Sequence, residues 1–312
     1  MVKYRKRMMF GCIVLMLILL TACNPERQPF PSLPGSSKSS ASEPIGEQLN
    51  YQITGVEPAA GQMQTTRKAM EQYGLSDWSL LSSSSAAMPA ALERAINTQQ
   101  PIVVTGWTPH WMFNKYDLKY LDDPKNIFGS GEEIHTVTRK NLKQDEPSAY
   151  AFLDRFFWTP EEMQEIMVTV QDGADPADAV KQWADAHPDR IKEWTDGIKP
   201  VSGKTIKLSY PAWDSEIVST NLIAYILKEK LGYNVSMMQV EVGPMYVGLA
   251  NGDTDAIVAA WLPTTHVEYW KQYKAKLDDL GPNMKGVRIG LVVPAYMNID
   301  SIEDLATSSS GS

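Results

Sequence analysis

The sequence predicts an α/β fold with two lobes, each of which contains a βαβαβ unit. Two stretches that start about 155 residues apart, at Tyr51 and Thr205, repeat the same succession of strand-like and helix-like segments. The third strand-like run of each unit is strongly apolar and ends at a tryptophan, Trp107 or Trp261. Strands that alternate with helices pair in parallel, with helices on the faces of the sheet. We therefore expect a mostly parallel sheet in each lobe.

In the first unit, five segments follow one another with short connections. Runs rich in apolar residues predict strands at 51–56, 78–83 and 101–107. Helical spacing of apolar residues predicts helices at 61–74 and 86–96. The first of these helices ends in a glycine, a residue that closes many helices.

The second unit follows the same order. Its strands are predicted at 205–210, 234–242 and 254–261, and its helices at 214–232 and 245–252. Past the third strand, both units continue with Trp-x-Pro, a histidine and an aromatic-rich segment that ends in Asp-Asp. This segment predicts one further helix in each unit. The repeat therefore extends from the strands into the loops that follow them.

The chain begins with a segment typical of a lipoprotein signal peptide. Four basic residues lie within the first seven positions. The apolar run that follows has 11 residues, well short of the ~20 that span a bilayer. The run ends in "LTAC", the pattern of a lipobox, so Cys23 would become the lipid-modified N-terminus. We expect a signal peptide at 1–22, a flexible, serine- and proline-rich linker at 23–49 and a flexible tail at 307–312.

Charge and cysteine content disfavour several classes of function. Cleavage before Cys23 would change the net charge from −8 to −12, because it removes four of 29 basic residues and none of 37 acidic ones. This balance disfavours nucleic acid or anionic lipid as the main partner. One of the two cysteines lies inside the signal peptide, so neither a disulfide nor a thiolate site is expected. His135 and His187 lack ligand-like spacing and HExxH is absent, so we predict no metal or cofactor.

Three tryptophans are expected to meet in a cleft between the lobes. Trp107 and Trp261 end the third strands of the two units, and ligands of open α/β sheets bind at the carboxyl ends of the strands. Trp213 lies in the loop after the first strand of the second unit, before a helix that Asp214 or Ser215 would cap. Indole faces attract cations, and a quaternary ammonium is the usual guest of an aromatic cage. The cleft is therefore predicted to bind a methylated ammonium group.

The corresponding loop of the first unit suits an anion. It places Gly61 and Gln62 at the start of a helix, where backbone N–H groups are free to bind a negatively charged group. One lobe would then offer oriented amides and the other would offer indole faces. A small zwitterion with a carboxylate at one end and a methylated ammonium at the other fits both halves.

Six specific motifs lie between about Tyr51 and Leu305: "VVTGWTPHWMF", "WDSEI", "AWLPTTH", "KLDDLGPN", "GLVVPAYM" and "SIEDL". Through them the chain closely resembles the glycine betaine-binding lipoproteins of osmoprotectant ABC importers, the OpuAC type. The resemblance implies a two-lobed, periplasmic-binding-protein-like fold of type II outside the cytoplasm. It implies a protein that closes over glycine betaine and delivers it to a transmembrane permease. The order of the segments resembles a circularly permuted branch of that family.

The resemblance also implies the site residues and the lobe boundaries. Carried over by position, the cage falls on Trp107, Trp213 and Trp261, and the carboxylate clamp falls on the backbone amides of Gly61 and Gln62 with the side chain of His266. Other members have isoleucine at the position of Gln62, a change that a backbone donor tolerates. The first lobe would be 50–128 plus 295–306 and the second 129–294, with a hinge where the chain crosses twice.

Some alternatives stay open. For His110 and Trp111, capping of backbone carbonyls and packing within their own lobe are favoured over ligand contact. Sugars also stack on tryptophan, so a lipid-anchored carbohydrate-binding protein is the alternative function, although the motifs offer few side chains to bond hydroxyl groups. The serine cluster at 82–85 lacks the Gly-x-Ser-x-Gly pattern, and catalytic residues are not expected. The ligand range includes glycine betaine, proline betaine, carnitine and sulfonium analogues.

Overall fold

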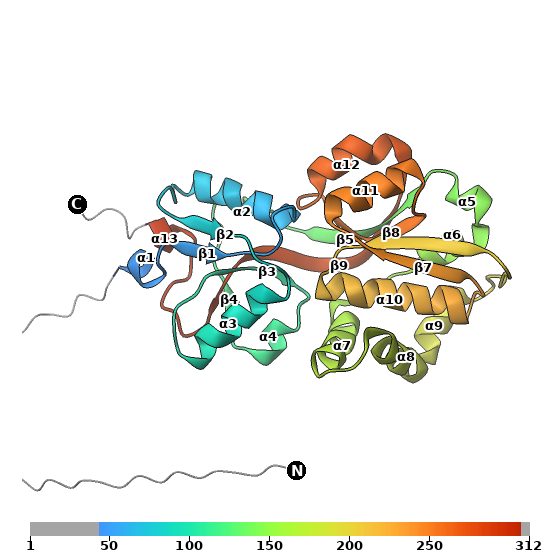
Figure 1. Cartoon of the computed structure of the whole chain (residues 1–312), viewed down its shortest axis with the longest axis horizontal. Helices are drawn as coiled ribbons and strands as arrows, with labels where there is room; N and C mark the ends of the chain where they lie inside the picture. Colours follow the sequence, from blue (N-terminus) through green and yellow to red (C-terminus); the bar gives the residue numbers. More distant parts are fainter. Residues whose placement is uncertain (1–43, 307–312) are drawn as a thin grey trace, which may run out of the picture. The chain divides into compact units, whose positions relative to one another are not determined.

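The computed structural model describes residues 44–306 and contains both predicted βαβαβ units (Figure 1). The first unit consists of β1 (Gln52–Thr54), α2 (Gly61–Gln72), β2 (Ser79–Leu81), α3 (Ala87–Asn97) and β3 (Val104–Thr108). β1 pairs in parallel with both β2 and β3, which confirms the predicted parallel sheet. Gly74, with a φ of 70°, follows α2 as predicted, because glycine adopts this left-handed conformation without strain. The predicted signal peptide, Cys23 and the tail at 307–312 lie outside the described residues.

The second unit repeats this order. It consists of β6 (Thr205–Tyr210), α10 (Asp214–Glu229), β7 (Asn234–Gln239), α11 (Val242–Asn251) and β8 (Ala256–Leu262). β6 pairs in parallel with both β7 and β8. All residues of β8 are buried, as expected for a strand covered on both faces. Trp107 in β3 and Trp261 in β8 therefore occupy equivalent places near the carboxyl ends of buried strands, as the repeat predicts.

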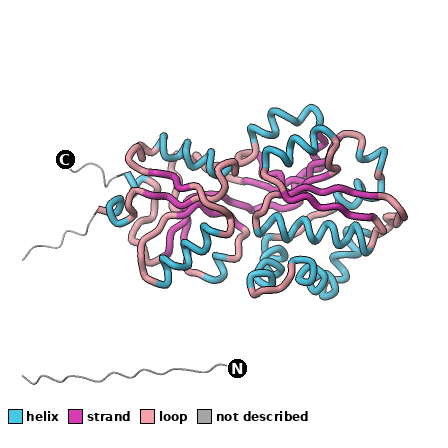
Figure 2. Tube along the Cα trace, in the orientation of Figure 1, coloured by secondary structure: helices cyan, strands magenta, loops and turns pink. Residues whose placement is uncertain are grey.

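One long strand joins the strands of the two units. β9 (Leu277–Pro294) pairs antiparallel with β5 (Glu132–Arg139) along its first part, and with β3 and β4 (Leu118–Tyr120) along its last part. The strands form one path in the order β2-β1-β3-β9-β5-β8-β6-β7, with β4 beside β9. Figures 1 and 2 show β9 passing from the strands of the second unit to those of the first.

The pairing of β9 bears on where the lobes divide. The sequence prediction counts 129–294 as the second lobe and returns to the first at 295. In the structure, residues 288–292 already pair with β3, whereas residues up to 287 pair with β5. We therefore propose that the change of lobe falls inside β9, near residue 288, earlier than the sequence prediction places it.

The other helices start with recognisable signals. They are α1 (Ile45–Gln48), α4 (Met112–Lys115), α5 (Leu142–Asp145), α6 (Pro147–Arg155), α7 (Pro160–Gln171), α8 (Pro176–Ala186), α9 (Pro188–Thr195), α12 (Val267–Tyr273), the 3₁₀ helix η1 (Lys274–Lys276) and α13 (Glu303–Ala306). Helices α6 to α9 each begin with a proline. Proline lacks a backbone N–H, but no hydrogen bond is lost, because an N–H in the first turn has no acceptor within the helix. α7 also has a complete capping box, in which Thr159 and Glu162 bond each other's backbone N–H.

Two sequence predictions about local structure are wrong. Neither Asp-Asp pair ends a helix, because Asp122 and Asp123 follow β4, and Asp278 and Asp279 lie in β9. In both places a neighbouring strand supplies backbone hydrogen bonds, and this pairing overrides the helical pattern. The predicted linker also extends too far, because α1 forms within it and packs against α13, and the adjoining Leu49 is buried.

Candidate functional site

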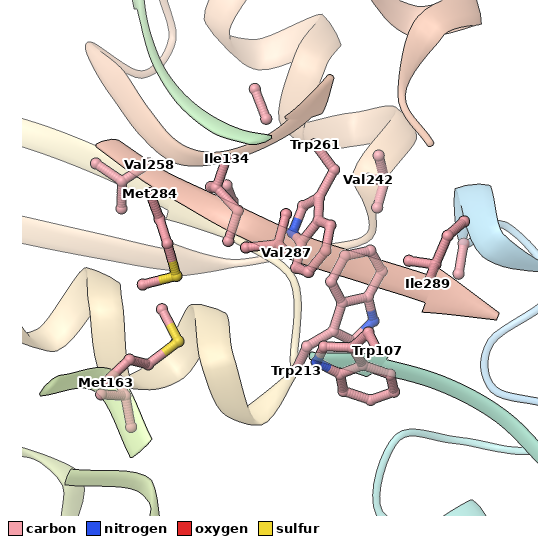
Figure 3. Close-up of a cluster of buried hydrophobic side chains, with 14 of the residues drawn as sticks. Trp107, Ile134, Met163, Trp213, Val242, Val258, Trp261, Met284, Val287 and Ile289 are labelled. Carbon is pink, nitrogen blue, oxygen red and sulfur yellow. The ribbon is translucent and has the colours of Figure 1, made fainter. Parts of the chain in front are cut away.

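Three tryptophans and three other side chains line one small cavity. Its volume is about 10 Å³, and its lining residues are Gln62, Trp107, Trp213, Trp261, Thr265 and Ile289. Figure 3 shows the three indoles gathered beside β9, the strand that carries Ile289. The tryptophans come from β3, from the residue before α10 and from β8. The sequence reasoning expected these tryptophans and Gln62 at one place. It missed Thr265, which lies in the motif "AWLPTTH" but was given no role there, and Ile289, which lies outside the six motifs.

The indoles are buried and held by hydrogen bonds at their edges. Trp107 Nε1 donates to Ser215 Oγ at 3.2 Å, and Trp261 Nε1 donates to Glu216 Oε1 at 2.7 Å. The ring centroids of Trp107 and Trp213 lie 6.5 Å apart, with their planes inclined at 47°. Because protein groups bind the N–H groups of Trp107 and Trp261, a ligand meets the carbon surfaces of these rings. A desolvated indole face attracts a cation with about 0.5–2 kcal/mol.

The start of α10 contacts the first unit and lacks the predicted cap. Trp213 holds the N-cap position, and no side chain there caps the helix. Asp214 Oδ2 accepts a hydrogen bond from Trp111 Nε1 at 2.9 Å and lies 3.2 Å from His110 Nε2. The hydroxyl of Ser215 is the acceptor for Trp107. The prediction that Asp214 or Ser215 caps α10 is therefore wrong, because both side chains bind residues of the first unit.

His110 and Trp111 connect the two units. His110 Nδ1 accepts from the backbone N–H of Met112 at 3.1 Å, which leaves the ring proton on Nε2, facing Asp214. The carbonyl of His110 accepts from Gln164 Nε2 at 3.1 Å. The prediction that the His110 ring caps backbone carbonyls is thus wrong. Trp111 was expected to pack within its own lobe, but its indole N–H also bonds Asp214 of the second unit. Neither residue lines the cavity.

The start of α2 reaches the cavity through Gln62, whereas Gly61 does not line it. Gly61 and Gln62 are the first two residues of α2, and the first N–H groups of a helix have no acceptor within it. Gln62 lines the cavity, and its side-chain Oε1 is buried with no partner in the described part of the chain. A Cβ atom on Gly61 would lie 2.0 Å from the backbone O of Thr265, so only glycine permits this approach. A carboxylate would meet the positive end of the helix dipole here.

His266 is buried beside the cage with one ring nitrogen unpaired. Its Nδ1 accepts from the backbone N–H of Trp261 at 3.2 Å, which leaves the ring proton on Nε2. Nε2 has no partner among the described residues. Burial lowers the pKa of His266 to about 3, so the ring is neutral at physiological pH and Nε2 is a donor. His266 does not line the cavity itself, but its ring centroid lies 6.0 Å from that of Trp213.

A buried carboxylate that the sequence reasoning missed, Glu132, holds the loop before His266. Glu132 Oε1 accepts from the backbone N–H groups of Thr264 and Thr265 at 3.1 and 2.9 Å. Its Oε2 accepts from the Thr265 hydroxyl at 3.0 Å. Glu132 begins β5, which pairs with β9 near the change of lobe. Only partners that are distant in sequence mark Glu132, so the local sequence carried no signal for this role.

Glu132→Gln should lower the free energy of unfolding by about 1–3 kcal/mol, because the amide turns one acceptor into a donor beside Thr265. Urea unfolding of the purified chain measures the change. Glu133→Gln is the matched control: Glu133 is only partly buried and lies 3.4 Å from Lys285 Nζ, so its loss should cost less than about 1 kcal/mol. Equal losses from the two variants would contradict the anchoring role of Glu132.

Two other pockets of the described chain contain no tryptophan: one lies beside Phe128 and Arg288, the other beside Arg139 and Asp255. The five other tryptophans lie outside the cavity, and all but one of them are buried in the core: Trp78, Trp158, Trp183, Trp194 and the partly buried Trp270. Within residues 44–306, no group of three or more His, Cys, Asp and Glu side chains could hold a metal ion. No helix in this range is long and apolar enough to cross a membrane.

Comparison with known proteins places the chain in a family. The model of the family described as the substrate-binding domain of ABC-type glycine betaine transport systems (OpuAC) matches residues 37–186 and 204–311. The chain is also similar to the glycine betaine/carnitine transport binding protein GbuC of Listeria monocytogenes. The two are 50% identical over 307 residues, which cover 97% of this chain and 99% of GbuC.

Solved structures include more distant relatives. Lactococcal OpuAC, in its closed-liganded conformation with glycine betaine, is 40% identical over 51% of this chain and 64% of its own, with a TM-score of 0.44. The ProX protein from Borrelia burgdorferi is 26% identical over 52% of this chain and 63% of its own, with a TM-score of 0.45. The matches thus span less than two thirds of either solved chain. On the family match and the likeness to GbuC, the chain belongs to the family of substrate-binding domains of ABC-type glycine betaine transport systems.

Proposed function

We propose that the chain captures glycine betaine in the cavity between Trp107, Trp213 and Trp261. Its family makes it a substrate-binding protein of a glycine betaine ABC importer and not an enzyme. The observation that carries the proposed site is the convergence of three buried indoles on one cavity. A trimethylammonium group cannot donate a hydrogen bond, and aromatic carbon surfaces are the protein groups that stabilise it best.

The carboxylate end of the ligand has its own partners in this proposal. The backbone N–H groups of Gly61 and Gln62 and the Nε2–H of His266 are the donors. Two features support this arrangement: the N–H groups belong to the first turn of α2, and Nε2 of His266 is buried without a partner. A ligand carboxylate would satisfy these donors in a water-poor site, where such hydrogen bonds are strongest.

The proposal also covers transfer of the ligand to the permease and attachment of the chain to the membrane. We infer that the loaded protein hands its ligand to the transmembrane permease of the importer, outside the cytoplasm. Cys23, which lies outside the described residues, would carry the lipid that holds the chain at the membrane. The name of GbuC, which includes carnitine, supports carnitine as a second ligand of this chain. Carnitine shares the trimethylammonium and carboxylate ends of glycine betaine at a larger separation.

The test is a calorimetric titration of the full chain in detergent with glycine betaine, carnitine, choline, glycine and glucose. We expect saturable binding of glycine betaine with a Kd of about micromolar order, because three aromatic contacts and a clamped carboxylate exceed the cost of association. Glycine has the carboxylate but no methylated ammonium, and it should not bind measurably. Binding of glucose without glycine betaine would favour the alternative function, a carbohydrate-binding protein.

A further inference from the structure

A buried carboxyl group lies directly behind one wall of the tryptophan cavity. Glu216 is the third residue of α10, and its side chain is fully buried. Its Oε1 accepts the hydrogen bond from Trp261 Nε1 at 2.7 Å, the shorter of the two bonds that hold the cage indoles. A fully buried acidic side chain is rare unless a partner compensates for the lost hydration. The partners of Glu216 therefore decide what it does.

The hydrogen bonds of Glu216 connect it to two walls of the cavity. The hydroxyl of Ser215 lies 3.5 Å from Oε1 and that of Ser219 lies 3.4 Å from Oε2. The Ser215 hydroxyl also accepts the N–H of Trp107. One chain of hydrogen bonds thus runs from Trp107 through Ser215 and Glu216 to Trp261. All of these partners are neutral, so they orient the carboxyl without neutralising its charge.

No cation among the described residues pairs with Glu216. The elements packed against α10 carry these titratable side chains: Glu161, Glu162 and Glu165 on α7, Asp178, Lys181 and Asp185 on α8, Lys207 and Tyr210 on β6, and none on β7 or β8. The neighbouring turns add His110 and His266, and α10 itself carries Asp214, Tyr225, Lys228 and Glu229.

Burial raises the pKa of Glu216 to about 7, and its three side-chain hydrogen bonds oppose this rise. The carboxyl is therefore poised between its neutral and ionised forms near physiological pH.

We propose that Glu216 is the counter-charge of the tryptophan cavity. It is a positioning residue whose ionised form fixes Trp261 and attracts the ligand's quaternary ammonium. Binding of the cation therefore releases a proton from Glu216. The proposal rests on the proposed function of the cavity. The carboxyl O–H bond breaks, the electron pair stays on the carboxylate, and the proton passes to solvent. The ionised carboxylate also strengthens the bond from Trp261 Nε1 and increases the electron density of the indole that faces the cation.

The pH dependence of binding follows from this coupling. A bound cation stabilises the carboxylate, so it lowers the pKa of Glu216. The Kd for glycine betaine should then be constant well above pH 7, rise as pH falls through 7, and level off below the pKa of the liganded state. A lowering of that pKa by one unit corresponds to a rise in Kd of about tenfold between pH 8 and pH 5. His266, with its pKa of about 3, stays neutral across this window.

The experiment compares the full chain with its Glu216→Gln variant, titrated with glycine betaine and with choline from pH 5 to pH 8. Glutamine keeps an acceptor for Trp261 but cannot ionise. We expect the wild-type Kd for both ligands to rise about tenfold on acidification and the variant's Kd to be weak and independent of pH. A purely structural role of Glu216 would leave the two pH profiles parallel, and that result would overturn the proposal.

Proton release by the wild-type protein gives a second readout that needs no variant. Calorimetry at pH 7 in two buffers of different ionisation enthalpy should show a fraction of a proton released for each glycine betaine bound, and none at pH 9. Absence of release at pH 7 would overturn the role of Glu216 even if the variant fails to fold. Absence of any binding at pH 8 would instead reject the proposed function of the cavity, so the two failures are distinguishable.

Discussion

We expect Trp213→Ala to weaken glycine betaine binding by about 5- to 30-fold while the chain stays folded. Trp213 is the cleanest of the three positions for this test, because no residue within 44–306 accepts a hydrogen bond from its indole N–H. The corresponding truncations at Trp107 and Trp261 would also remove a hydrogen bond to Ser215 or Glu216. Loss of one desolvated indole face costs about 1–2 kcal/mol of binding free energy, which corresponds to that rise in Kd. Calorimetric titration of the variant measures it.

Trp183→Ala is the matched control for this result. The exposed fraction of Trp183 is 5%, against 6% for Trp213, but Trp183 lies on α8 and stacks on Trp194 away from the cavity. We expect its truncation to lower the free energy of unfolding by about 3–5 kcal/mol and to leave the Kd of the folded protein unchanged. Equal losses of affinity from both variants would argue against a specific cage.

We expect His266→Ala to weaken glycine betaine binding by about 10- to 100-fold and to change choline binding far less. A hydrogen bond from a neutral donor to a buried carboxylate contributes about 1.5–3 kcal/mol. Choline carries the same trimethylammonium group with a hydroxyl in place of the carboxylate, so it loses little when Nε2–H is removed. The ratio of the two Kd values, wild type against variant, is the measurement.

Choline also controls for damage to the cavity. His266 Nδ1 accepts the backbone N–H of Trp261, and alanine leaves that N–H unpaired. If the variant disturbed Trp261, both ligands would lose affinity in proportion, and the specific role of His266 at the carboxylate would be rejected. A selective loss for glycine betaine would support the clamp.

The repeat was the part of the structure that the sequence predicted best. Regular alternation of strand and helix patterns located both βαβαβ units. Each pattern is set by residues close in sequence, because apolar residues recur wherever a helix face or a whole strand is buried. The position of Trp107 and Trp261 followed from the topology alone, since parallel strands end at the same edge of a sheet. The same reasoning brought Gln62 to the cavity, where the structure places it.

Features that depend on contacts between distant segments escaped prediction. Glu132 and Glu216 look like ordinary surface acids in the sequence. Only the folded chain shows that Glu132 accepts a hydrogen bond from Thr265 and that Glu216 accepts one from Trp261. Asp214 resembles a helix cap, but Trp111 from the other unit competes for its carboxylate. Local patterns indicate which side chains can bond, and tertiary packing decides which partner each one takes.

The long strand β9 affects how a local loss of strand pairing in one lobe spreads to the other. Its residues 277–287 bond to β5 and its residues 288–292 bond to β3, within one uninterrupted strand. The two halves of the sheet therefore meet in one continuous backbone at residues 287–288, so we expect loss of pairing in one half to reach the other through that junction.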